Sequence, residues 1–252
     1  MSNSKTEIEV IQHKKRAIRK INNLFESYIT SRDPKLLKKT DLLSYWFEEF
    51  VNYIYAEDSF QPQRLLSYKR GDIIRVNLGF RVGNEMGGLH YAVVIENKNA
   101  HSSGVITIIP LSSTDGKTVH DNNVDIGVEL YSKAEAQRLR LLDDAKKGLT
   151  ETTDLLNALR TAKNNSDDVN DALDTITQKQ SEIKKTLAII NRYDNELRRM
   201  KSGSMAVVNQ ITTISKQRIY TPKKSVDFLY NVSLSDTAMD KITKKLSERL
   251  LH

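Results

Sequence analysis

A loop with four glycines in ten residues, set between short β-type runs, is the feature that most constrains the fold of this chain. The loop spans residues 79–88 and follows a β-branched run at 72–78. Two more apolar runs follow at 91–95 and 105–109. Runs of this length bounded by turn residues are typical of strands. We therefore expect an antiparallel sheet, with a loop whose glycines let another backbone or a ligand approach closely.

The last third of the chain contains one more β-type run and a closing helix. The run at 204–214 is predicted to be a fourth strand of the same sheet. From Leu234 the sequence favours a helix to the C-terminus, with Ser235 as N-cap and Asp236 in the first turn. The apolar residues at helical spacing along it are Met239, Ile242, Leu246 and Leu250.

Between these β-type segments the chain is strongly helical. Two series of positions alternate in spacings of four and three, which is the pattern of a coiled-coil seam. The first series is Leu142, Ala145, Leu149, Thr152, Leu156 and Leu159. The second is Val169, Leu173, Ile176, Gln180, Ile183, Leu187, Ile190, Asp194 and Leu197. A polar turn at 164–168 separates them, so we expect an antiparallel hairpin of two helices, each about 45–50 Å long.

The first sixty or so residues are also expected to be helical. Apolar residues recur at helical spacing on both sides of Asp33-Pro34, a pair that marks a new helix start. Residues 13–20 form a basic face on the first helix. Two interpretations of that face stand, an RNA-binding stripe and an ordinary solvated surface.

Four separated motifs, in this order, make the chain similar to the MazF/PemK toxin family. They are Arg70-Gly71-Asp72, Gly83-Asn84-Glu85-Met86-Gly87-Gly88, Pro110-Leu111-Ser112-Ser113 and the segment from Asn209 to Ile219. The resemblance covers roughly residues 68–130 and 203–252, and it implies an α+β fold built on a small SH3-like β-barrel. The domains expected are an N-terminal helical extension (1–65), the barrel (66–130 and 203–252) and an inserted antiparallel coiled-coil hairpin (131–202), with a C-terminal helix closing the barrel.

The resemblance also implies a function. Members of this family are toxins of type II toxin-antitoxin systems that cut single-stranded RNA without a metal, usually as homodimers, and are restrained by an antitoxin protein. In that reaction a ribose 2′-hydroxyl attacks the adjacent phosphate, which requires a proton acceptor, a proton donor and groups that stabilise the phosphorane charge. No cofactor and no metal are expected. The expected partners are single-stranded RNA, a cognate antitoxin and a second copy of the chain.

The family's catalytic pair is an arginine two residues after Gly-Gly and a threonine or serine after Pro-Leu. Here these positions hold His90 and Ser112. Histidine gives up the permanent charge of arginine, but it titrates near neutrality and can act as a general acid or base. His120, in a polar loop, would supply a second such group. Each has a structural alternative. His90 is then a structural histidine at a strand start or a relic of a site that no longer cuts, Ser112 an ordinary strand-end hydroxyl, and His120 a solvated loop residue.

RNA contacts are expected from the glycine-rich loop and the fourth strand. The residues that match the family's binding motifs, or could replace its missing cations, are Arg81, Asn84, Glu85, Gly87, Gly88, Gln210 and Thr212. Two arginines common in the family are absent, since Val207-Val208-Asn209 and Thr212 occupy their places. Their loss removes phosphate contacts, which normally supply much of the affinity for nucleic acid. Glu85 has an alternative role as a cap of the loop.

A second class of function therefore remains open. It is a catalytically altered or inactive toxin-like barrel that acts as a protein or RNA interaction module through the coiled-coil hairpin. Poisoning of a DNA topoisomerase ranks third, because the motifs match the RNase branch. The missing arginines favour the interaction module, whereas the intact Gly87-Gly88-x-His90 and Pro110-Leu111-Ser112 pieces favour the enzyme.

Composition limits these possibilities further. There is no cysteine, which excludes disulfides, zinc-thiolate sites and thiol nucleophiles. The net charge of +7 suits RNA or an acidic antitoxin segment without choosing between them. No apolar run is long enough to span a bilayer and the first ten residues lack an apolar signal core, so the sequence predicts a soluble, cytoplasmic protein with no membrane partner.

Overall fold

The computed structural model describes residues 5–114, 116, 118–161 and 166–250. Contacts between Cα atoms divide the chain into two compact units, Met1–Ser59 and Phe60–His252. Within the described residues, no helix is both long enough and apolar enough to cross a membrane.

The N-terminal unit is a pair of helices, α1 (Glu7–Thr30) and α2 (Pro34–Ala56), followed by a 3₁₀ turn at Glu57–Ser59. Thr6 and Glu9 form a capping box, in which each side chain accepts a hydrogen bond from the other residue's backbone N–H. The carboxylate of Asp33 accepts from the amide of Lys35 at 2.8 Å and starts α2, as the Asp33-Pro34 pair predicts. The unit is therefore two helices with well-defined starts.

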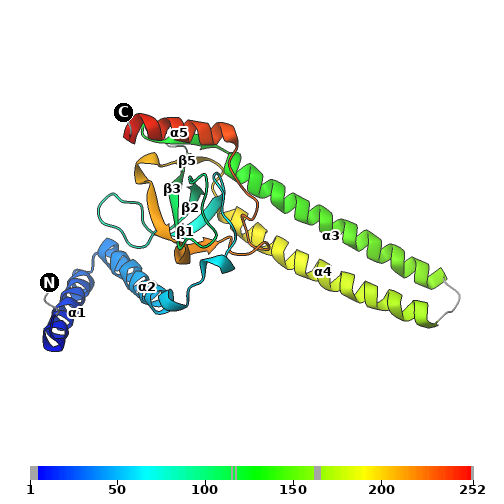
Figure 1. Cartoon of the computed structure of the whole chain (residues 1–252), viewed down its shortest axis with the longest axis horizontal. Helices are drawn as coiled ribbons and strands as arrows, with labels where there is room; N and C mark the ends of the chain where they lie inside the picture. The colour runs from blue at the N-terminus through cyan, green and yellow to red at the C-terminus, as the bar shows by residue number, and fades with distance from the viewer. Residues whose placement is uncertain (1–4, 115, 117, 162–165, 251–252) are drawn as a thin grey trace. The chain divides into compact units, whose positions relative to one another are not determined.

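The second unit is a mixed fold built on an antiparallel sheet (Figure 1). Its strands are β1 (Ile73–Asn77), β2 (Leu89–Val94), β3 (Val105–Ser113), β4 (Val124–Gly127), β5 (Ser204–Ala206), β6 (Thr212–Ser215) and β7 (Ile219–Thr221). The strand order is β4-β5-β3-β2-β1-β7, with β6 also paired to β3. The α+β class is therefore confirmed. The predicted closed barrel is not seen, because within the described residues no pairing joins β4 to β7.

The sheet carries an apolar core on each face. The register of β1 and β2 places Ile73 opposite Val93 and Ile74 opposite Ala92, and successive side chains of a strand point to opposite faces. Ile73 and Val93 join one buried cluster with the hairpin and the C-terminal helix. Ile74 and Ala92 join a second cluster with β3, β6 and β7. Both faces of the sheet are therefore covered, which explains the continuous apolar run at 91–95.

The expected fourth strand is broken into two pieces that pair with the same edge of β3. In β5, Ala206 lies opposite Leu111, and in β6, Thr212 lies opposite Ile108. The chain between them forms a 3₁₀ turn at Val208–Gln210, and the amide of Val207, just before the turn, donates to the carbonyl of Pro110 at 3.0 Å. The single run at 204–214 is therefore two short strands with a turn between them.

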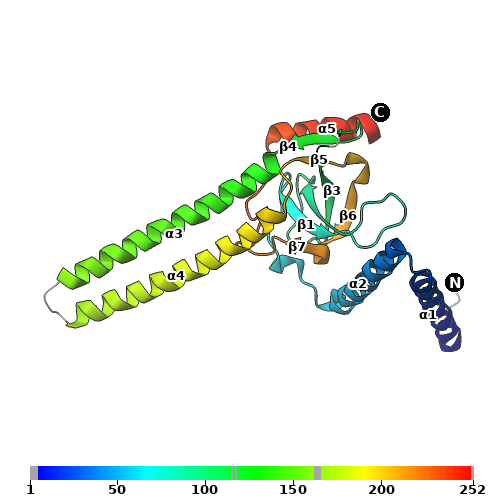
Figure 2. The same cartoon turned by 180° about the vertical axis from the view of Figure 1, so that it is seen from behind.

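Two long helices, α3 (Glu129–Thr161) and α4 (Ser166–Arg199), run side by side as an antiparallel hairpin (Figures 1 and 2). The expected turn at 164–168 lies partly outside the described residues. Five of the fifteen expected seam positions are exposed, and the residue before each of them is partly covered instead; the exposed five are Leu149, Leu156, Leu173, Gln180 and Leu187. On α4 the partly or fully covered positions include Val169, Ala172, Ile176, Lys179, Ile183, Thr186, Ile190, Tyr193, Asp194 and Leu197. On α3 they include Leu141, Ala145, Gly148, Thr152, Leu155 and Leu159.

The displacement has a physical cause. On α3 two apolar rows lie side by side, Leu141-Gly148-Leu155 and Leu142-Leu149-Leu156. On α4 the covered row is Ala172, Lys179 and Thr186, and Lys179 pairs with Glu151 of α3. Leu149 and Leu187 belong to the row expected to face the partner helix, yet they are 59% and 45% exposed. The helices meet instead along the neighbouring row, which includes Gly148, whose lack of a side chain makes room for Ile183. The structure confirms the helical hairpin, whereas coiled-coil packing stays a prediction.

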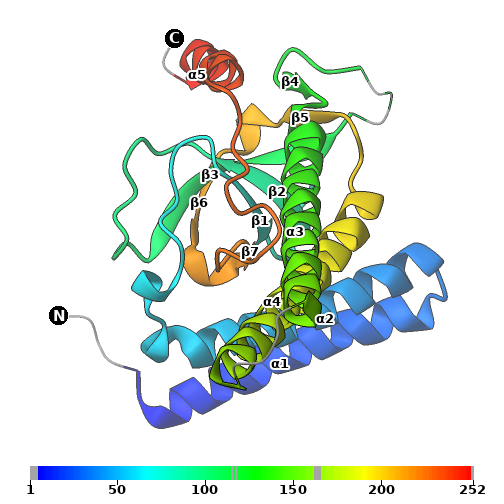
Figure 3. The ribbon, with the colours of Figure 1, turned by 90° about the vertical axis from the view of Figure 1, so that its right-hand side faces the viewer.

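The base of the hairpin is part of the core of the sheet, and Figure 3 shows the hairpin end-on against the strands. The buried ring of Tyr193 packs edge-on against Phe228 with the ring centroids 4.9 Å apart, and its hydroxyl donates to the carbonyl of Asp227 at 3.3 Å. Helix α5 (Asp236–Leu250) starts at Ser235, whose hydroxyl accepts from the amide of Ala238, as predicted. Both helical additions are therefore anchored to the same face of the sheet.

The seam of the hairpin can be tested by shortening one side chain at a time. Ile190 is 5% exposed, so Ile190→Ala should lower the free energy of unfolding by about 2–5 kcal/mol. Leu173 on the same helix is 47% exposed, so Leu173→Ala should cost less than about 1 kcal/mol. Urea denaturation followed by circular dichroism measures both. Equal losses would show that Leu173 is a seam position.

The burial of Tyr193 predicts a loss of stability in alkali. Burial raises the pKa of Tyr193 to about 12, whereas an unfolded tyrosine titrates near pH 10. The unfolded state therefore releases this proton first, and stability present below pH 10 is lost as the pH rises towards 12. Between pH 8 and 11, Tyr193→Phe should lose about 1 kcal/mol less than the wild type. Tyr55→Phe, at an 82% exposed site, is the control and should follow the wild type.

Candidate functional site

The glycine-rich loop closes on itself through its backbone. The amide of Gly88 donates to the carbonyl of Gly79 at 2.8 Å, and the amide of Leu78 donates to the carbonyl of Gly88 at 2.8 Å. A Cβ at Gly87 would lie 2.7 Å from the oxygen of Gly79, closer than carbon and oxygen can approach. Glycine at position 87 is therefore a steric requirement of the closed loop.

Gln210 holds the loop from the other side of the site. Its Oε1 accepts from the amide of Met86 at 3.1 Å, and its Nε2 donates to the carbonyl of Asn84 at 3.5 Å. Gln210 reaches the loop because it lies in the 3₁₀ turn that interrupts the fourth strand. The side chain predicted to bind RNA therefore uses its amide, in this structure, to position the loop.

Arg81 and Glu85 lie within the loop and face each other. The Nε of Arg81 donates to the carbonyl of Leu78 at 3.0 Å, and its Nη1 lies 3.7 Å from the Oε2 of Glu85. The side chain of Arg81 is 31% exposed and that of Glu85 is 56% exposed. Arg81 is thus held on the loop and still presents a cation to solvent, beside a partly neutralising carboxylate.

Two hollows adjoin the loop and the 3₁₀ turn. The smaller has a volume of about 170 Å³ and is lined by Leu78, Arg81, Glu85, Met86, Pro110, Asn209, Gln210, Ile211 and Thr212. The larger has a volume of about 510 Å³ and is lined by Asn84, Met86, His120, Asp121, Asn122, Asn123, Val207, Asn209 and Gln210. They share Met86, Asn209 and Gln210, so together they form one surface depression. Its lining is rich in amides, which offer both donors and acceptors.

His90 lies at the start of β2, just after the loop, and is half-buried. Its Nε2 is 3.0 Å from the carbonyl oxygen of Gly87. A carbonyl can only accept, so Nε2 carries the hydrogen and Nδ1 of the neutral ring is left as an acceptor. The histidine that replaces the family's arginine is therefore oriented by the loop that it follows.

Ser112 lies near the end of β3 on the same face of the sheet as His90. The register places Ala92 opposite Pro110, and two further residues along each strand lead to His90 and Ser112. At that point β3 pairs with β5, where Ser112 lies opposite Met205. The predicted catalytic pair therefore sits at one end of two neighbouring strands.

The structure thus brings most of the predicted residues to one region. Five of the seven residues expected to contact RNA line the two hollows, as does His120, and Gly87 and Gly88 form the adjoining loop. His90 and Ser112 are not among the lining residues of either hollow. Sequence reasoning missed Met86, Asn122 and Asn123. Of these three, only Met86 lies in a recognisable motif, the glycine-rich motif, which could have indicated that it lines the site.

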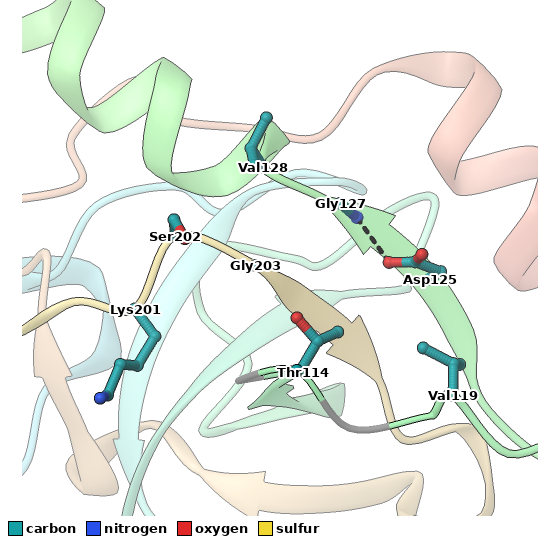
Figure 4. A pocket seen from close by; sticks show the side chains of 9 residues that line it. Thr114, Val119, Asp125, Gly127, Val128, Lys201, Ser202 and Gly203 are labelled. Atoms are coloured by element: carbon teal, nitrogen blue, oxygen red, sulfur yellow. Dashed lines mark hydrogen bonds between the residues drawn. The ribbon is translucent and has the colours of Figure 1, made fainter.

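A third hollow, of about 510 Å³, lies near β4 and β5 (Figure 4). It is lined by Thr114, Gly116, Val119, Asp125, Gly127, Val128, Lys201, Ser202 and Gly203. Asp125 accepts from the amide of Gly127 at 2.8 Å, which fixes its carboxylate against the backbone (Figure 4). None of the predicted site residues lines this hollow, so we place the candidate site at the glycine-rich loop.

The hold of Gln210 on the loop predicts a local effect of its removal. In Gln210→Ala the amide of Met86 loses its acceptor, and hydrogen exchange at Met86 should become about tenfold faster, which corresponds to one hydrogen bond. Gln178→Ala, at an exposed position of α4, is the matched control. Unchanged exchange at Met86 in Gln210→Ala would show that the loop holds its shape without this side chain.

Comparisons with known proteins bear on this site. Residues 69–177 match a family described as "PemK-like, MazF-like toxin of type II toxin-antitoxin system". The match covers β1 to β4, α3 and the first part of α4. Among solved structures, MazF (Form-I) from Deinococcus radiodurans is similar at 10% identity and a TM-score of 0.37, over 74% of this chain and 99% of that chain. A comparison with curated proteins gives no match.

The family resemblance rests on the sequence match alone, because a TM-score of 0.37 is too low to support it. Residues 69–177 are therefore similar to a toxin domain of type II toxin-antitoxin systems. More narrowly, they are MazF/PemK-like, and the resemblance inferred from the four motifs is confirmed.

Proposed function

We propose that this chain is the toxin of a type II toxin-antitoxin system and acts as a metal-independent endoribonuclease on single-stranded RNA. The observation that supports this most is the joint depression formed by the glycine-rich loop and the 3₁₀ turn. Two elements distant in sequence meet there through Gln210, and one of them, the glycine-rich loop, lies on the part of the chain that matches the toxin family. The expected partners are single-stranded RNA, an antitoxin and a second copy of the chain.

The lining of the depression favours a single strand as the substrate. Sequence-specific recognition of RNA uses the exposed edges of unstacked bases, which offer donors and acceptors side by side. The amides of Asn84, Asn122 and Asn123 can pair with such edges, and Arg81 can pair with a phosphate. With few cations at the site, we expect affinity to depend on bases more than is usual for RNA-binding sites.

The proposed chemistry assigns one role to each predicted group. The Nδ1 of His90 takes the proton of the ribose 2′-hydroxyl, whose oxygen forms the new bond to phosphorus. The bond from phosphorus to the 5′ oxygen then breaks, and that oxygen receives a proton from His120. Ser112 donates a hydrogen bond to a phosphoryl oxygen as charge develops. The products are a 2′,3′-cyclic phosphate and a 5′-hydroxyl.

The first experiment is incubation of the purified protein with mixed-sequence single-stranded RNA in EDTA, followed by sequencing of the fragments and typing of their ends. The wild type should produce 2′,3′-cyclic phosphate ends. His90→Ala should cleave at least about 100-fold more slowly, as expected for loss of a general base.

His101→Ala is the matched control, because His101 binds the carbonyl of Leu65 in a loop away from the site and should not affect cleavage. Full activity of a folded His90→Ala protein would remove His90 from the mechanism. Absence of cleavage by the wild type on any single-stranded RNA would overturn the proposed function itself.

A further inference from the structure

The two long edges of the helical hairpin differ. Along one edge an ion pair bridges the helices, with the Nζ of Lys179 on α4 2.5 Å from the Oε2 of Glu151 on α3. The same contact lowers the pKa of Glu151. On this edge long polar side chains close the gap between the helices.

The other edge is an open apolar groove of about 310 Å³. It is lined by Leu149, Thr152, Thr153, Leu156, Gln180, Ile183, Lys184 and Leu187. Among these, Leu149 is 59% exposed, Leu187 is 45% exposed and Leu156 is 38% exposed. We call this surface the hairpin groove. Large aliphatic side chains gathered at one place on a surface indicate an interaction site.

The spacing of these leucines specifies the shape of what binds. Leu149 and Leu156 are seven residues apart on α3, and Leu173 and Leu187 are fourteen residues apart on α4, with Gln180 midway between them. These four leucines are exposed apolar residues that the pairing of α3 with α4 leaves uncovered. Leucines that recur every two turns along two neighbouring helices form a groove into which a third helix packs.

Charge specifies the chemistry of that helix. At 100° per residue, the exposed charged residues on the groove side are Lys146 and Arg160 on α3 and Lys184, which lines the groove, on α4. The acidic residues Asp144, Glu151 and Glu182 fall on the opposite edge. An occupant that places carboxylates beside its apolar row is therefore favoured, whereas the same groove of a second copy would oppose lysine to lysine.

We propose that the hairpin groove binds an acidic amphipathic helix of a partner protein. The helix has apolar residues at spacings of three and four, flanked by aspartate or glutamate. This proposal does not depend on RNA cleavage, because the groove shares no residue with the candidate site.

Two synthetic peptides about four heptads long are the probes. Both carry leucine at the seam positions, and they differ only in having glutamate or lysine at the flanking positions. Fluorescence anisotropy with the full-length protein should show the glutamate peptide binding at least about tenfold more tightly than the lysine peptide, with a preference that declines as salt is added.

Paired variants locate the binding site. Lys184→Glu should weaken binding of the glutamate peptide at least about tenfold, whereas Lys185→Glu, at the next position and not part of the groove, should not. The double variant Leu149→Gln with Leu187→Gln should abolish binding. Leu139→Gln, at a 51% exposed site on α3 outside the groove, should not. All variants should keep the helical content of the wild type.

Several results would overturn the proposal. These are the absence of binding by either peptide, equal binding of both, or binding that survives the double variant. If the wild type sediments as a dimer and the double variant as a monomer, the groove binds a second copy of the chain instead. RNA cleavage is measured in parallel and should be unchanged in all of these variants, so failure here and failure of the nuclease proposal are distinguishable.

Discussion

The site depends on one missing hydrogen-bond donor, at Pro110. The carbonyl of Pro110 accepts from the amide of Val207 at 3.0 Å, so in an antiparallel strand its nitrogen faces the same neighbour. Proline has no N–H to complete that pair, and pairing along this edge of β3 stops there. The neighbouring chain then leaves the sheet as the 3₁₀ turn Val208–Gln210 before β6 resumes the ladder. The 3₁₀ turn that interrupts the pairing thus places Gln210 against the glycine-rich loop.

This arrangement explains how a site can persist after cations have been lost. The loop is shaped by backbone hydrogen bonds around Gly87 and by the amide of Gln210, and neither requires arginine. The hydrogen bond from His90 to the carbonyl of Gly87 then orients the ring against the same backbone. In the proposed reaction, the histidine that stands in place of a permanent charge would transfer protons rather than stabilise charge.

How much the sequence could predict varies with the length of each signal. The sequence predicts the long helices and the apolar runs of β1 to β3, as well as the helix start at Asp33-Pro34 and the N-cap at Ser235. The four residues of β4 and three of β7 are too short to show alternation, so both strands were missed. The run at 204–214 has one uniform β signature, and its break is caused by Pro110, almost a hundred residues earlier. Likewise, convergence of His120 and Gln210 on one hollow follows from tertiary contacts alone.

A third of the predicted seam positions are exposed, because at those positions the neighbouring row of each helix faces the partner helix. Near the sheet, Leu130, Tyr193 and Leu197 are almost fully buried because the core covers them from several sides. Farther out, each helix has one neighbour, and burial falls to isolated positions such as Ala145, Thr152 and Ile176. Two helices bury a single stripe each, so the second row of leucines contributes no stability to the isolated hairpin. Binding of a third helix in the hairpin groove would cover these leucines, and this explains why exposed positions at heptad spacing hold leucine.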